Sequence, residues 1–264
     1  MFVQFSKYHG TGNDFIMIDG RGQDSSRLDH EAIRTMCSRR FGVGADGLII
    51  LGESSKVDFR MQYFNADGHE GTMCGNGGRC ITAFASELGI IGMDTKFEGI
   101  DGIHTATLLP NREIRLKLND VNGVRWADDG YLIDTGSPHF VKYVSRVNEM
   151  DVEREGSELR NHARFGKDGV NVNFVEVEGN SNKINVRTYE RGVEGETYSC
   201  GTGVTAAAIC SYFHFKTEIL SYQVNTLGGK LNVAFKAQHH NRFSDIYLTG
   251  PVEKVYEGSI EIGG

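Results

Sequence analysis

Proline and long apolar segments are scarce in this sequence, and positively charged residues are fewer than negatively charged ones. Its 264 residues include 3 prolines, about 1% where soluble proteins average roughly 5%. They also include 28 Lys and Arg against 35 Asp and Glu, a net charge of −7. Because nucleic acids and anionic membranes attract basic patches, this balance predicts neither as a partner. The apolar run Leu48–Leu51 is far too short to cross a bilayer, and the N-terminus lacks the pattern of a signal peptide.

Cysteine is present in an odd number, and glycine is abundant. Five cysteines in a mid-sized chain without a secretion signal indicate reduced thiols and a cytoplasmic protein rather than a disulfide framework. The 34 glycines follow no Gly-X-Y period and stand among ordinary apolar residues, which excludes collagen and a flexible linker. Fourteen of them fall in four short segments, 8–15, 41–47, 64–80 and 189–205, so the excess marks particular turns.

Short alternating or apolar runs dominate the chain and are typical of β-strands. The predicted strands are Phe2–Phe5, Phe15–Asp19, Gly47–Leu51, Asp58–Phe64, Ile103–Leu109, Glu113–Leu118, Tyr131–Asp134, Phe140–Val144, Asn171–Val177, Lys183–Tyr189, Gln223–Asn225, Lys230–Ala237, Ile246–Thr249 and Val252–Tyr256. Two surface helices are predicted. Asp29–Arg39 begins with an Asp cap and has apolar residues at helical spacing, and Met150–Asn161 is more polar.

Two further predicted helices resemble each other. Arg79–Leu88 follows a Cys-Gly-Asn-Gly turn, and Val204–Phe213 follows a Cys-Gly-Thr-Gly turn. Both are apolar on nearly every side, which predicts buried helices. Each has strands before and after it, so the chain is interpreted as an internal duplication. We expect one half over residues 1–120 and the other over 121–250, with the boundary near the polar stretch Asn119–Gly130.

The two cysteine turns suggest acid/base catalysis by thiols. The first N–H groups of a helix form an anion site, and a cysteine placed there has its thiolate favoured. One such turn is more often a structural cysteine before a tight turn. Two of them in a duplicated fold can face each other across one cleft, as stereochemical inversion at a carbon requires. No lysine context suggests a pyridoxal Schiff base, so the mechanism is expected to need no cofactor.

Two other interpretations of these residues are weaker. Gly201–Ala206 fits the dinucleotide fingerprint, but no apolar strand precedes it and no acidic residue follows at the required distance. Cys74 and Cys80 are six residues apart, and the histidines form no zinc motif. Neither a dinucleotide nor a metal ion is therefore predicted.

Three long motifs resemble those of the diaminopimelate epimerases, in the same order and spacing. Lys7–Phe15 is similar to the opening motif of that family, Phe64–Gly77 to its first catalytic motif, and Tyr189–Gly203 to its second. The resemblance implies a cofactor-independent isomerase that interconverts LL-2,6-diaminopimelate and meso-2,6-diaminopimelate, in lysine and peptidoglycan biosynthesis. It also implies a two-base mechanism, in which one cysteine removes the Cα proton and another returns one.

The family fold that the resemblance implies is α/β (α+β, with mixed sheets). It has two pseudo-symmetric halves, each a curled sheet around a central buried helix, with the active site in the cleft between them. On the same ground we expect the C-terminal segment 251–264 to join the first half. We also expect a homodimer that acts on a small molecule.

The resemblance further implies a role for each candidate residue. The two acid/base thiols are Cys74 and Cys200. The backbone N–H groups that hold the reacting carboxylate are those of Gly75, Asn76, Gly201 and Thr202. The side chains that bind the remaining amino and carboxylate groups are those of Asn13, Asn65, Asn171, Glu190 and Arg191, since a dizwitterion needs oxygen acceptors for ammonium and a forked donor for carboxylate. His139 and Glu190 support catalysis, and no metal is expected.

Three positions depart from the family pattern. Ser137 stands where Asn is frequent, and Gly47 where some members have Gln, so we assign no substrate contact to either. His69 stands where Ser is common and is interpreted as a tolerated loop change. The remaining cysteines are expected to be inert structural thiols: Cys37, Cys80 and Cys210.

Two rival functions remain. A proline racemase or hydroxyproline epimerase shares the two-cysteine logic, but typically has His at the position of Asn76 and a different second motif. Asn76 and the pair Glu190-Arg191 favour diaminopimelate, and phenazine-type isomerases lack the paired thiols. From a different class, a binding protein closing on a zwitterionic amino acid would fit the same turns without catalysing exchange at Cα.

Overall fold

The structure, a computed structural model, describes residues 2–21, 28–179, 181–239 and 241–262. The chain forms two compact units. Unit 1 comprises Met1–Leu116 and Gly250–Gly264, and unit 2 comprises Lys117–Thr249. In the described ranges, no helix is both long and apolar enough to cross a membrane.

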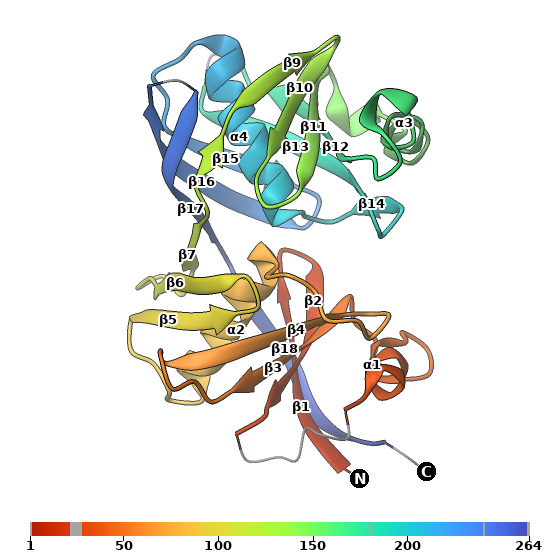
Figure 1. The fold of residues 1–264 in the computed structure, drawn as a ribbon, viewed down its shortest axis with the longest axis vertical. Coiled ribbons are helices and arrows are strands. Elements are labelled where there is room, and N and C mark those ends of the chain that lie inside the picture. The colour runs from red at the N-terminus through yellow and green to blue at the C-terminus, as the bar shows by residue number, and fades with distance from the viewer. Residues whose placement is uncertain (1, 22–27, 180, 240, 263–264) are drawn as a thin grey trace. The chain divides into compact units, whose positions relative to one another are not determined.

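Unit 1 is built on one mixed sheet. In spatial order its strands are β18 (Glu253–Glu261), β1 (Phe2–Gly10), β2 (Asn13–Asp19), β3 (Gly47–Gly52), β4 (Phe59–Asn65), β5 (Asp94–Gly99), β6 (Gly102–Leu108) and β7 (Ile114–Leu118). Only β2–β3 and β4–β5 are parallel. Helix α1 (His30–Cys37) connects the first parallel pair, and α2 (Gly75–Glu87) the second. Strand β18 pairs with β1 along its whole length, so the C-terminal strand lies beside the N-terminal one (Figure 1).

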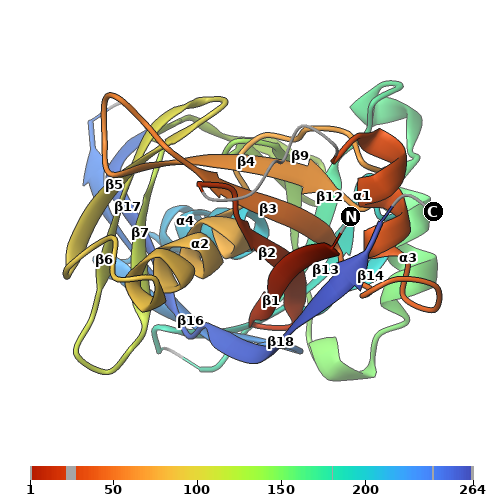
Figure 2. The same cartoon turned by 90° about the horizontal axis from the view of Figure 1, so that it is seen from below.

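The centre of this sheet is buried on both faces, which explains its continuous apolar runs. Ile16 and Ile50 pack in the cluster beneath α1, whereas Ile49 on the other face reaches Gly77 of α2. The sheet curls, so that α2 packs against β1, β2, β3 and β6 (Figure 2). Most of α2, from Gly75 to Ala85, is buried.

The two surface helices are slightly shorter than predicted. Asp29 caps α1 by accepting a hydrogen bond from the Ala32 N–H at 2.9 Å. The helix ends at Cys37 because Ser38 adopts an extended backbone, which leaves Arg39 outside it. Helix α3 (Val152–Arg160) is capped in the same way by Asp151.

Unit 2 repeats this design. In spatial order its strands are β9 (Val124–Ala127), β10 (Gly130–Asp134), β11 (Pro138–Tyr143), β12 (Asn171–Val177), β13 (Lys183–Glu190), β15 (Ser221–Thr226), β16 (Gly229–Gln238), β17 (Arg242–Gly250) and β8 (Val121–Asn122). The short strand β14 (Gly195–Thr197) adds to the other edge of β13. Only β11–β12 and β13–β15 are parallel, and these pairs are joined through α3 and α4 (Gly201–Phe215).

The order of parallel and antiparallel pairs is therefore the same from β1 to β7 as from β10 to β17, with a helix at each parallel connection. Helix α4 packs against strands on both sides of the curl, from β10 to β16, and Val204–Ser211 is buried throughout. This confirms the predicted α+β fold, with a curled mixed sheet around a buried helix in each unit.

Candidate active site

Cys74 stands at the start of the central helix of unit 1. It is the N-cap residue of α2, with an extended backbone (φ −90°, ψ 132°). No acidic residue lies in the first turn of α2. The free N–H groups and the positive end of the helix dipole are therefore not neutralised by a carboxylate of that turn.

Asn13 joins Cys74 through hydrogen bonds. It follows the tight turn between β1 and β2, and its Oδ1 accepts from the Cys74 thiol at 3.6 Å and from Asn76 Nδ2 at 3.2 Å. Its Nδ2 donates to Asp46 at 2.8 Å. The structure thus brings together three of the predicted residues, and we call Asn13, Cys74 and Asn76 the first half-site.

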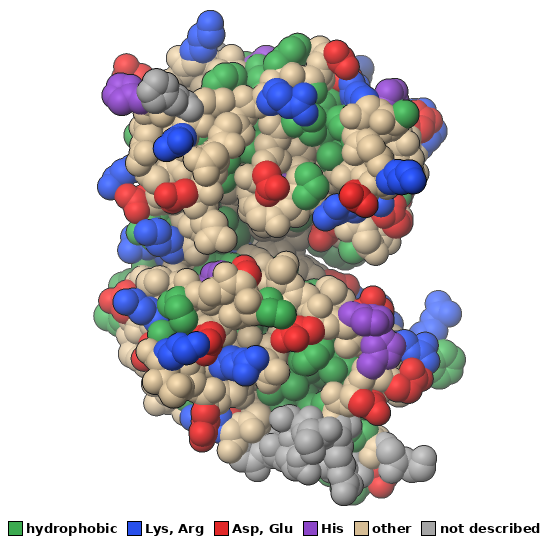
Figure 3. All heavy atoms as spheres, in the orientation of Figure 1, with side chains coloured by type: hydrophobic (Ala, Val, Ile, Leu, Met, Phe, Trp, Pro, Cys, Tyr) green, Lys and Arg blue, Asp and Glu red, His purple; other side chains and the backbone are tan. Residues whose placement is uncertain are grey.

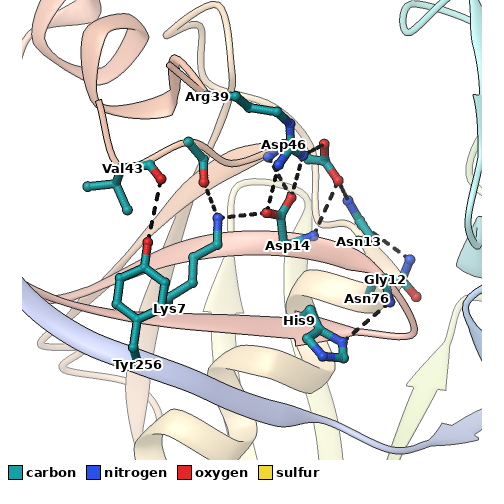
Figure 4. A network of polar contacts seen from close by, with 11 residues as sticks. Lys7, His9, Gly12, Asn13, Asp14, Arg39, Val43, Asp46, Asn76 and Tyr256 are labelled. Atoms are coloured by element: carbon teal, nitrogen blue, oxygen red, sulfur yellow. Dashed lines mark hydrogen bonds and ion pairs between the residues drawn. The ribbon is translucent and has the colours of Figure 1, made fainter. Parts of the chain in front are cut away.

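A network of ion pairs and hydrogen bonds holds the start of β2, next to Asn13 (Figure 4). Asp14 pairs with Lys7 and with Arg39, each at 2.7 Å, and Arg39 also pairs with Asp46 at 2.7 Å. Lys7 is buried and also donates to the carbonyl of Gly44. Burial alone would raise the pKa of Asp14, but hydrogen bonds from Arg39 and Lys7 outweigh it and lower the pKa to about 2. Asp14 therefore stays ionised, and its ion pairs with Lys7 and Arg39 hold the backbone next to Asn13 in place.

Asn65 is held separately, at the exposed end of β4. The Tyr63 hydroxyl donates to its Oδ1 at 2.8 Å. Gly47 lies opposite Asn65 in the sheet, and a Cβ atom on Gly47 would stand 2.7 Å from the Tyr63 ring. The carbonyl oxygen of Phe64 is closer still, at 2.6 Å. The Tyr63 ring and this oxygen together occupy the space that a side chain at position 47 needs, which explains glycine at this position.

Cys200 occupies in unit 2 the place that Cys74 has in unit 1. It is the N-cap of α4, with φ −112° and ψ 113°, and again no acidic residue lies in the first turn. Its Sγ is 3.4 Å from Oγ1 of Thr202. Oγ1 of Thr202 is in turn 3.0 Å from Nε2 of His139.

The network around His139 determines its tautomer. Asn173 Nδ2 donates to Nδ1 of His139 at 3.0 Å, so the proton of the neutral ring is on Nε2. From there it can be donated to Thr202 or to Ser137, whose Oγ is also 3.0 Å away. The Thr202 hydroxyl is then free to donate to the Cys200 sulfur. Asn173 and Ser137, for which the sequence predicts no role, therefore belong to this site.

The ring of His139 is neutral near pH 7. Burial, and secondarily the charge of Arg191, lower the pKa of His139 to about 3. In the unfolded chain the pKa of histidine is about 6.5, so acid protonates the unfolded state first. The contribution of this group to stability is present above pH 6.5 and is lost as the pH falls towards 3.

We expect this loss to be about 1.4 kcal/mol per pH unit below pH 6.5. Urea unfolding of the wild type and of His139→Gln at pH 7, 6 and 5 measures it. The variant lacks the titrating group, so its free energy of unfolding should fall less steeply with pH. Equal slopes for the two proteins would contradict a buried neutral His139.

The remaining predicted residues of unit 2 adjoin this network. Asn171 donates through Nδ2 to Ser137 at 3.2 Å, and its Oδ1 accepts from the Arg191 backbone N–H at 2.9 Å. Glu190 is the last residue of β13. Arg191 follows it and lines a cavity of about 640 Å³ together with Asp134, Pro138 and other residues of unit 2. We call Cys200, Thr202, His139, Asn171 and Arg191 the second half-site.

The other cysteines differ from Cys74 and Cys200 in their surroundings. Burial raises the pKa of the Cys37 thiol to about 12, and it raises the pKa of Cys80 and Cys210 further. All three are free thiols in the cores of their units. Their low thiolate fraction agrees with the expectation that they are inert.

His69, interpreted above as a loop change, packs on His30 at the start of α1. Their ring nitrogens are 3.2 Å apart, and Figure 3 shows histidine side chains (purple) together on the surface of unit 1. Across the described ranges, no three His, Cys, Asp or Glu side chains are grouped to hold a metal ion.

Comparison with known proteins identifies a family. The family model described as diaminopimelate epimerase matches residues 5–117 and 131–255. A diaminopimelate epimerase of Flavobacterium psychrophilum is 46% identical over 258 residues, covering 98% of this chain and 100% of that protein. The diaminopimelate epimerase of Chlorobaculum tepidum is 42% identical and covers 96% of this chain and 99% of its own length.

Solved structures share the fold at low sequence identity. A phenazine biosynthesis protein of the PhzF family from Bacillus anthracis aligns with a TM-score of 0.78 at 15% identity, covering 99% of this chain and 100% of that one. A hydroxyproline epimerase from Agrobacterium vitis aligns with a TM-score of 0.72 at 14% identity, covering 99% and 93%. At such identities the likeness shows the fold alone.

Proposed function

This chain belongs to the diaminopimelate epimerase family, and from that premise we propose that it interconverts LL-2,6-diaminopimelate and meso-2,6-diaminopimelate by a cofactor-independent, two-cysteine proton transfer at Cα. The observation that carries the mechanism is the pair of cysteines at one position of a repeated design. Each is the N-cap of the buried helix that connects a parallel pair of strands, β4–β5 in unit 1 and β13–β15 in unit 2.

Inversion at a carbon needs one base on each face of it. In the proposal, the thiolate of one cysteine removes the Cα proton, and the thiol of the other donates a proton to the opposite face. Cys74 and Cys200 exchange these roles in the reverse direction. In the proposal, the first and the second half-site act on the same substrate molecule.

Negative charge moves from Cα to the adjacent carboxylate in the transition state. In the proposal, the backbone N–H groups of Gly75 and Asn76 in α2, and of Gly201 and Thr202 in α4, hold that carboxylate. Two helix dipoles then stabilise the developing charge, and no acidic residue in either first turn opposes them.

The remaining side chains account for the rest of a dizwitterion. Arg191 offers a forked donor to the distal carboxylate, and Glu190 offers a carboxylate to an ammonium group. The side chains of Asn13, Asn65 and Asn171 contact the remaining amino and carboxylate groups in the proposal. His139 supports Cys200 by donating from Nε2 to Thr202, whose hydroxyl then donates to the sulfur.

The cellular setting belongs to the same proposal. The product is used in lysine and peptidoglycan biosynthesis, and the enzyme acts in the cytoplasm as a homodimer. Sedimentation of the purified protein tests the dimer.

Solvent deuterium exchange tests the reaction. Reduced enzyme incubated with LL-diaminopimelate in D₂O is expected to yield the meso isomer with deuterium at the inverted Cα, because the returned proton comes from the solvent-exchanged thiol. Proline and hydroxyproline, offered as controls under the same conditions, are expected to take up no deuterium. Absence of deuterium from diaminopimelate would leave a binding protein as the better interpretation, and exchange into proline would favour the racemase.

A further inference from the structure

Arg79 is a buried cation close to the first half-site. It lies in α2, five residues after Cys74, and its exposure is 0%. Its Nη2 donates to Oγ1 of Thr11 at 3.4 Å. Its Nε and Nη1 have no hydrogen-bond partner among the described residues. Burying a guanidinium with two unsatisfied nitrogens is costly, so its retention calls for a reason.

Within the described part of the chain, no Asp or Glu forms a salt bridge with Arg79. The titratable groups that act on it are Cys80 and Cys74 of α2 and Glu113 of the turn before β7. Burial raises the pKa of Cys80, which is therefore a neutral thiol. Glu113 is bound by Asn111 at 2.9 Å and forms no salt bridge with Arg79 among the described residues. Cys74 bonds to Asn13, and Arg79 bonds to Thr11 of the same turn. The thiol of Cys74 is therefore the group near Arg79 whose charge changes during the proposed reaction.

The turn between β1 and β2 contacts both Arg79 and the first half-site. A Cβ atom on Gly10 would stand 3.0 Å from Nη2 of Arg79, so the turn packs directly on the guanidinium. The same turn leads to Asn13, whose Oδ1 accepts a hydrogen bond from the Cys74 thiol.

We propose that Arg79 is a positioning residue, whose buried positive charge stabilises the thiolate of Cys74 and whose guanidinium supports the turn that carries Asn13. The inference rests on the proposed function, since it takes Cys74 as one of the two acid/base thiols. A charge pair in a poorly solvated interior interacts more strongly than in water. A neutral side chain of similar volume would fill the same space without this effect, and often without loss of stability.

The test follows the alkylation of Cys74 by iodoacetamide as a function of pH, in a Cys200→Ser background. The other three cysteines are buried, and peptide mass spectrometry assigns the modified residue. In Arg79→Met we expect the midpoint of the profile to rise by about one pH unit, which makes alkylation near pH 7 about tenfold slower. At a pH above both midpoints the two rates should converge, because only the thiolate fraction differs.

Arg79→Lys is the matched control, since it keeps the charge and is expected to keep most of the wild-type midpoint. Thermal unfolding and circular dichroism verify the fold, and Arg79→Gln replaces Arg79→Met if the latter does not fold. An unchanged midpoint in the folded neutral variant, or an equal shift in Arg79→Lys, overturns the proposal. Alkylation needs no substrate, so such a failure is distinguishable from a failure of the epimerase itself, which deuterium exchange reports.

Discussion

Replacing Cys74 or Cys200 with serine is expected to lower the rate of epimerisation by about a thousandfold, because a positioned acid or base contributes 10²- to 10⁴-fold and a hydroxyl is a far weaker base than a thiolate at neutral pH. Serine is favoured at a helix N-cap, and both cysteines occupy such positions. The variants should therefore fold, and the loss should appear in kcat. The measurement is the initial rate of meso-diaminopimelate formation, with thermal unfolding measured in parallel.

Cys210→Ala is the matched control for these variants. Cys210 lies in α4, the helix that Cys200 caps, but is 0% exposed, and burial keeps its pKa high. The epimerisation rate of Cys210→Ala should stay within a fewfold of the wild-type rate, even though the substitution removes some packing from the core. Full activity in Cys74→Ser, or a thousandfold loss in Cys210→Ala, would contradict the assignment of the two thiols.

Much of the fold follows from local sequence patterns. The two helices that are apolar on nearly every side were predicted as buried, because a helix enclosed by a curled sheet exposes little of its surface to water. Strand β5 was missed, because Asp94–Gly99 carries charged residues at every exposed position and only Thr95 and Phe97 point inward. The short strands β8, β9 and β14 have too few residues to display an alternation.

The sequence motifs predict the residues at the centre of the candidate site, but not the residues that hold them in place. Motifs identified Asn13 and Cys74, and the structure joins them by a hydrogen bond. Asp46, which holds the Asn13 amide, is 33 residues away and belongs to a loop that only the folded sheet brings near. Asn173 fixes His139 from the neighbouring strand, and the one available signal was its spacing of two from Asn171. Partners across strands depend on register, which a single sequence does not reveal.

Arg191 should decide which amino acids the enzyme accepts. If its guanidinium binds the distal carboxylate through two charge-assisted hydrogen bonds, Arg191→Met should lower kcat/KM for LL-diaminopimelate by about 10²- to 10³-fold, equivalent to roughly 3–4 kcal/mol. Arg191→Lys should recover only part of this loss, since an ammonium group cannot bind a carboxylate through a planar fork.

Lysine separates recognition from chemistry, because it has the same amino groups as diaminopimelate but no distal carboxylate. Solvent exchange at Cα of lysine should be slow in the wild type and nearly unchanged in Arg191→Met. The preference for diaminopimelate over lysine should therefore fall by the same factor as kcat/KM for diaminopimelate. Arg125→Met is the control, because Arg125 lines the same cavity of about 640 Å³ and is assigned no substrate group. If Arg191→Met lost activity on lysine and diaminopimelate equally, Arg191 would act on the reacting centre or on His139, whose pKa it helps to lower, and the specificity role would be wrong.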